Sequence, residues 1–105
     1  MTTTVSLSQT EAIAGFRALG DPLRLQVVEL LRDREYCVCD LCDLLSVKQS
    51  KLSFHLKTLK EANLIQGRQD GRWIYYSLNL PHLLQLQDYL ASYRDAPLRS
   101  ARHCC

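Results

Sequence analysis

The chain has 105 residues, of which 47% are apolar and 23% are charged, and its formal net charge is +2. A chain of this length builds one small domain and leaves little apolar material for a second core. The sequence has no run of about 18 uncharged apolar residues, and its first residues lack the basic and apolar regions of a secretory signal. We therefore expect a cytoplasmic protein with no membrane span.

Positive charge is concentrated in the middle of the sequence. Residues 1–47 carry four basic and seven acidic side chains, whereas residues 48–72 carry six basic and two acidic ones. A local excess of Lys and Arg is typical of a surface that binds phosphate, and also of a solvated helix face. Charge alone leaves both explanations open.

The folded domain is expected over residues 8–95, between a flexible N-terminus at 1–7 and a flexible, cysteine-ending tail at 96–105. Ser8–Glu11 has capping-box spacing and predicts a first helix that ends at Gly20. The apolar positions of this helix are Ala12, Ile13, Phe16 and Leu19.

A second helix is predicted after Asp21, which caps it, with Pro22 in its first turn. Its inward positions are Leu23, Val27, Leu30 and Leu31. A short third helix is predicted over residues 37–45 and ends near Ser46. Its inward positions are Leu41, Leu44 and Leu45.

A fourth amphipathic helix is predicted from Val47 to Ala62, with Leu52, Leu56 and Leu59 as its buried stripe. Two short helices joined by a tight turn make a helix-turn-helix. The β-rich runs at 64–69 and 73–78 flank Asp70-Gly71, a strong hairpin signal, with Arg68 and Arg72 on either side of the tip.

A last helix is predicted beyond Pro81. Its apolar positions are Leu83, Leu84, Leu86, Leu90 and Tyr93, which spread more widely than one buried face requires. A domain of this size has a shallow core, so the excess would suit a homodimer seam formed by the first and last helices. We therefore predict a mainly α, dimeric winged helix-turn-helix with a small β-hairpin wing.

The fourth helix and the hairpin are the candidate interface for double-stranded DNA. In a helix-turn-helix the second helix enters the major groove, where polar side chains reach base edges and Lys and Arg neutralise phosphates. The candidate contacts are Gln49, Ser50, Lys51, Ser53, Phe54, His55, Lys57, Arg68 and Arg72. For any one of these side chains an ordinary surface or packing role is as good an explanation, and for His55 it is the better one. The assembled pattern favours DNA binding.

Three cysteines lie within six positions at Cys37, Cys39 and Cys42. In an unexported chain they are expected to be reduced, and three thiolates suit a soft ion. A helix N-terminus would lower their pKa. Cys39 and Cys42 share a helix face, so Cys37 joins them only if the first turn unwinds. Ligation would then distort the helix packed against the DNA-reading helix.

Three segments resemble the ArsR/SmtB family of winged-helix repressors. Residues 18–25 (ALGDPLRL) are similar to its opening signature, residues 52–59 (LSFHLKTL) to its recognition helix and residues 71–78 (GRWIYYSL) to its wing. Lys48 departs from the Ser that many members have near the recognition-helix cap. The resemblance covers about residues 12–93 and implies a homodimer that leaves operator DNA when a metal or metalloid binds.

Residues 36–42 (YCVCDLC) resemble the arsenite- and antimonite-responsive branch. This resemblance implies As(III) or Sb(III) as the inducer, Cys37, Cys39 and Cys42 as its ligands, and no organic cofactor. Two alternatives remain open: a repressor of the same fold that responds to cadmium, lead or oxidants, and a thiol-disulfide oxidoreductase using Cys39 and Cys42.

Cys104 and Cys105 end the chain, where they either supply additional thiol ligands to the other subunit or have no role.

The sequence has no catalytic triad, acid pair or Gly-rich phosphate loop, so we do not expect an enzyme.

Overall fold

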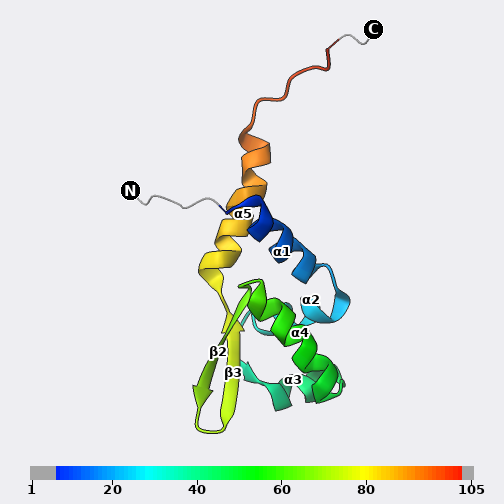
Figure 1. The fold of residues 1–105 in the computed structure, drawn as a ribbon, viewed down its shortest axis with the longest axis vertical. Helices are drawn as coiled ribbons and strands as arrows, with labels where there is room; N and C mark the ends of the chain where they lie inside the picture. Colours follow the sequence, from blue (N-terminus) through cyan, green and yellow to red (C-terminus); the bar gives the residue numbers. More distant parts are fainter. Residues whose placement is uncertain (1–6, 103–105) are drawn as a thin grey trace.

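The computed structural model describes residues 7–102; residues 1–6 and 103–105, and with them Cys104 and Cys105, lie outside the described part. In order, the elements are α1 (Gln9–Leu19), α2 (Pro22–Leu30), β1 (Tyr36–Cys37), α3 (Val38–Leu45), α4 (Gln49–Glu61), β2 (Ile65–Asp70), β3 (Trp73–Leu78) and α5 (Leu80–Asp95). In Figure 1, α1 lies beside α5 toward one end of the molecule, and the β2–β3 hairpin lies toward the other end, where α3 and α4 are also found. The predicted winged helix-turn-helix is confirmed.

The first two helices begin where the sequence predicts, because side chains bind their free amide groups. The Ser8 hydroxyl accepts from the amide of Glu11 (3.1 Å), and the Glu11 carboxylate accepts from the amide of Ser8 (3.0 Å). The Asp21 carboxylate accepts from the amides of Leu23 and Arg24 (2.9 and 3.1 Å). These bonds satisfy donors that a helix cannot pair internally.

The helix-turn-helix packs on one shared core. Leu41 of α3 and Leu52 and Leu59 of α4 are fully buried, in one cluster with Val27 of α2 and Leu31, which follows α2 directly. Ser46 closes α3 in the left-handed conformation (φ 54°) and the chain turns into α4. The predicted leucine stripe of α4 is therefore confirmed.

Four local predictions are corrected. Leu44 is 54% exposed and Ile13 is 50% exposed, so neither is a core residue of this chain. The third helix begins at Val38 rather than at Cys37, because Cys37 has an extended backbone and belongs to a strand. The fourth helix begins at Gln49, two residues later than expected.

The sheet has a strand that the sequence did not predict. The order is β1-β3-β2, with both pairs antiparallel. The hairpin loop is Gly71-Arg72 rather than Asp70-Gly71, because Asp70 pairs with Trp73. Gly71 has φ +63°, a conformation that glycine adopts without strain at the first loop position.

The last helix buries Leu86 against Gly15 of α1, where an added Cβ would come within 2.9 Å of the leucine methyls. Other apolar side chains of α5 are exposed: Leu80, Leu84, Leu90 and Tyr93. Within residues 7–102, no helix is both long enough and apolar enough to cross a membrane.

Candidate functional site

The outer face of α4 is polar, basic and open to solvent. The exposed side chains are Gln49, Ser50, Lys51, Ser53, Phe54 and Lys57. They cover the part of the helix surface that the buried leucines leave open to solvent. Phe54 is 65% exposed, an unusual position for a large aromatic side chain. The structure thus brings together six of the nine predicted DNA contacts on one helix face.

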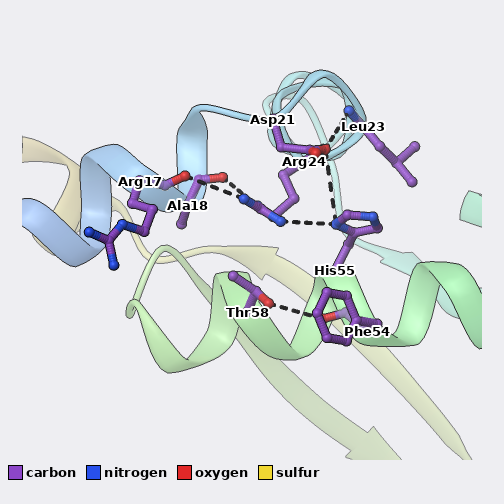
Figure 2. A network of polar contacts seen from close by, with 8 residues as sticks. All are labelled: Arg17, Ala18, Asp21, Leu23, Arg24, Phe54, His55 and Thr58. Atoms are coloured by element: carbon purple, nitrogen blue, oxygen red, sulfur yellow. Dashed lines mark hydrogen bonds and ion pairs between the residues drawn. The ribbon is translucent and has the colours of Figure 1, made fainter.

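His55 does not belong to this face. Its side chain is only 13% exposed and points toward the junction of α1 and α2 (Figure 2). Arg24 donates from Nη1 to His55 Nδ1 (3.1 Å), and Asp21 Oδ1 lies 3.9 Å from the same nitrogen. Because a guanidinium only donates, Nδ1 acts as an acceptor.

Arg24 ties three helices together. Besides His55 of α4, it donates to the carbonyl oxygens of Ala18 (2.7 Å) and Arg17 (3.4 Å), which end α1 (Figure 2). The sequence prediction missed Arg24, although it lies in the family signature at residues 18–25. Its contacts fix the middle of α4 relative to α1 and the start of α2.

The N-terminus of α4 begins without a side-chain cap. Lys48 occupies the N-cap position, and within residues 7–102 its side chain makes no capping hydrogen bond. An ammonium group has no acceptor for the first-turn amides. Among the described residues, the first-turn amides of α4 therefore have no side-chain acceptor from the N-cap position.

The two wing arginines have different surroundings. Arg72 lies exposed in the hairpin loop. Arg68 binds the Glu35 carboxylate through Nη2 and Nε, and its Nη1 lies 3.6 Å from Asp70. Its hydrogen bond to Glu35 lowers the pKa of that carboxyl group and raises the pKa of the guanidinium. Arg72 is thus freer than Arg68 to meet a phosphate.

The three cysteines lie at the junction of β1 and α3. Cys37 and Cys42 are partly buried and Cys39 is exposed. Within residues 7–102, no three His, Cys, Asp or Glu side chains stand close enough together to hold a metal ion as they lie. Cys37 belongs to the strand and the other two cysteines to α3, so bringing the three sulfurs together would rearrange this junction.

The expected lowering of the thiol pKa is wrong for Cys42. Burial, followed by the negative charges of Cys39 and Asp43, raises the pKa of the Cys42 thiol. Cys42 lies beyond the first turn of α3, where the helix dipole has little effect. Its side chain instead packs against the core.

The backbone of Cys42 holds the turn that leads into α4. Its carbonyl oxygen accepts from the amides of Ser46 and Val47, the latter at 3.2 Å. A displacement of Cys42 would therefore act directly on the turn of the helix-turn-helix.

These features define a class of protein. A helix-turn-helix with an exposed basic second helix, followed by an antiparallel hairpin, is the winged helix-turn-helix of DNA-binding proteins. The chain belongs to the arsR family of bacterial regulatory proteins, whose model matches residues 21–66. This family consists of regulators, so the oxidoreductase alternative is wrong.

Relatives extend the match beyond that segment. The transcriptional repressor SmtB homolog of Synechocystis is 38% identical over 90 residues, which cover 85% of this chain and 68% of that protein. The arsenical resistance operon repressor of Bacillus subtilis is 51% identical over 65 residues (61% of this chain, 62% of the relative). Its Escherichia coli counterpart is 45% identical over 69 residues (65% and 58%). The chain thus spans about three fifths of the length of these two repressors.

Solved structures agree with the fold. A crystal structure of an ArsR family transcriptional regulator has a TM-score of 0.77 at 19% identity, covering 87% of this chain and 94% of that one. A crystal structure described as a possible transcriptional regulator for arsenical resistance has a TM-score of 0.69 at 34% identity, covering 76% and 83%.

Proposed function

We propose that the protein is a cytoplasmic, homodimeric repressor that binds operator DNA and releases it when As(III) or Sb(III) binds Cys37, Cys39 and Cys42. The observation that carries the proposal is the position of Cys42, whose carbonyl oxygen holds the turn into α4. The arsenical resistance repressors among the relatives support the choice of inducer.

In this proposal α4 reads the major groove. Gln49, Ser50, Lys51, Ser53 and Phe54 reach base edges, whereas Lys57 and Arg72 neutralise phosphates. His55 and Arg24 position the helix from behind, since their contact faces away from its exposed side. Arg68 is not assigned a phosphate contact in this proposal, because its guanidinium is paired with the Glu35 carboxylate.

Inducer binding exchanges bonds without any oxidant or reductant. With arsenous acid, three As–O bonds give way to three As–S bonds, and each thiol proton leaves with a hydroxide as water. Gathering the three sulfurs requires movement at the start of α3, because they do not form a cluster as they lie. This movement strains the α3–α4 turn and lowers the affinity for DNA. Such coupling is typically about 5- to 150-fold.

The exposed apolar side chains of α1 and α5 supply the dimer surface. Ile13 and the outward residues of α5 (Leu80, Leu84, Leu90 and Tyr93) are each at least half exposed. A second copy would bury them and place two recognition helices about one turn of DNA apart. Leu90→Glu should shift the protein to monomers in analytical ultracentrifugation. Ser92→Glu adds the same charge at an exposed position of the same helix, off the face that carries Leu84 and Leu90, and should leave the dimer intact.

The DNA contacts are tested on a duplex that the protein selects from a random-sequence pool. Lys57→Ala should weaken binding to every sequence. It should also make the fall of the logarithm of the binding constant with the logarithm of salt concentration less steep, by about 1 in slope. Arg94→Ala, at an exposed position of α5, is the matched control and should leave the slope unchanged. An unchanged slope in Lys57→Ala would contradict the proposed interface.

The inducer site is tested on the same complex. Cys37→Ser, Cys39→Ser and Cys42→Ser should each bind the duplex as the wild type does but fail to release it with arsenite. If each variant keeps arsenite-driven release, the ligand assignment is wrong. The double variant Cys104→Ser/Cys105→Ser tests whether the tail supplies further ligands: lost or weakened release assigns it a part, and unchanged release assigns it none.

Cadmium, lead and peroxide, each applied under the same conditions, separate the alternative inducers. Release by arsenite at concentrations at which the others have no effect supports the metalloid assignment. Release by cadmium, lead or peroxide alone contradicts it.

A further inference from the structure

The central strand β3 joins the cysteine segment to the wing. Cys37 pairs with Tyr75 across β1–β3, and Tyr75 pairs with Arg68 across β2–β3. Directly opposite residues carry their side chains on the same face of a sheet, so the three form one row. The guanidinium carbon of Arg68 lies 4.9 Å from the centroid of the Tyr75 ring.

A bidentate ion pair spans this row. Glu35, two residues before Cys37, accepts from Arg68 Nη2 at Oε1 (2.5 Å) and from Nε at Oε2 (3.4 Å). The paired fork fixes orientation as well as distance. The segment that leads into β1 is thereby attached to β2, across the strand that lies between them.

We propose that Glu35 is a positioning residue that transmits inducer binding at Cys37 to the wing through Arg68. The inference rests on the proposed function, because it assumes that Cys37 is a ligand. The three cysteines do not form a metal-holding group as they lie, so ligation has to rearrange the junction of β1 and α3, and β1 is only two residues long. Because Glu35 precedes this strand directly, the movement draws Arg68 and β2 with it.

Inducer binding then acts on the DNA contacts by two routes. In one, movement of Cys42 displaces the turn into α4; in the other, movement of Cys37 displaces the hairpin through Glu35 and Arg68. The hairpin loop carries Arg72, a proposed phosphate contact, so displacing the wing removes a contact that α4 does not supply.

The first experiment compares operator affinity with and without saturating arsenite. Glu35→Gln should reduce the ratio of the two dissociation constants by about 2- to 30-fold, the range seen for residues that carry coupling. Its arsenite affinity without DNA, followed by the ultraviolet absorbance of As–S bonds, should stay close to that of the wild type. The ion pair is exposed, so its loss should cost little stability.

Asp33→Asn is the matched control. It removes the same charge two residues earlier, from an exposed carboxylate whose ion pair is with its neighbour Arg32. The ratio of its dissociation constants for operator DNA with and without arsenite, here called the release ratio, should equal that of the wild type. Arg68→Gln should behave as Glu35→Gln does, and the double variant should add nothing to either single change.

The second experiment observes the wing directly, without DNA. Trp73 is the only tryptophan of the chain and starts β3 at the hairpin loop. Arsenite should change its fluorescence in the wild type and in Asp33→Asn. The change should be much smaller in Glu35→Gln, and absent in Cys37→Ser.

Failure of this route is distinguishable from failure of the proposed function. The route is overturned if Glu35→Gln keeps the wild-type release ratio and Trp73 response, or if it weakens arsenite binding to the free protein as much as it weakens release. In either case the wild type still releases DNA. If the wild type binds arsenite without releasing DNA, the proposed function itself is wrong.

Discussion

The first two helices and the next two begin in different ways. α1 and α2 have their first-turn amides bound by Ser8 and Asp21. The N-cap residues of α3 and α4 are Cys37 and Lys48, and among the described residues neither makes a side-chain capping bond. The supporting helices are thus fixed by local hydrogen bonds, whereas the helices proposed to sense and read depend on packing. Helices held mainly by packing can shift when a ligand binds near their ends.

The largest expected effect tests this dependence on packing. Leu41→Ala removes a fully buried side chain of α3 and should lower the free energy of unfolding by about 2–5 kcal/mol in urea denaturation. Leu44→Ala, one turn further along the same helix, changes a 54% exposed side chain and should stay within about 0.5 kcal/mol of the wild type. Equal losses in the two variants would contradict the assigned packing.

A cap can be built where the chain has none. Lys48→Ser places a hydroxyl acceptor at the start of α4 and should raise the free energy of unfolding by about 1 kcal/mol. Lys51→Ser, inside the first turn, is the control for lost charge and should not stabilise the protein. If Lys48→Ser does not raise the free energy of unfolding, the first-turn amides of α4 already have partners.

The cap of α2 should respond to pH. Hydrogen bonds from the amide of Arg24 and then of Leu23 lower the pKa of Asp21 from its ordinary 3.8. A lowered folded-state pKa gives stability that is complete above the unfolded value and lost as pH falls through the folded value. Asn still caps a helix but does not titrate. The difference in unfolding free energy between wild type and Asp21→Asn should therefore narrow as pH falls from about 5 to about 2.

The smallest effect concerns thiol reactivity and leaves stability unchanged. The raised pKa of Cys42 and its partial burial should make it react more slowly with iodoacetamide at neutral pH than the exposed Cys39. Peptide mass spectrometry resolves the two sites over time. Faster labelling of Cys42 would mean that α3 opens readily, and would weaken the contrast between the two pairs of helices.

The sequence by itself determined the order of the five helices and the hairpin, the starts of α1 and α2, and the buried stripe of α4. These features depend on neighbours within a few positions, such as the capping box at Ser8–Glu11 and the leucine spacing from Leu52 to Leu59. Capping bonds and helical periodicity are local, so one chain segment is enough to predict them.

Only the tertiary structure decided which residues act on one another across the fold. β1 has two residues, too few to show a periodicity, and it exists because β3 offers an edge to pair with. The contact of Arg24 with His55 joins positions 31 apart, and that of Glu35 with Arg68 joins positions 33 apart. Spacing in the sequence places three cysteines close together along the chain, but their side chains follow two different elements. Whether they gather depends on the backbone between a strand and a helix, which local patterns do not fix.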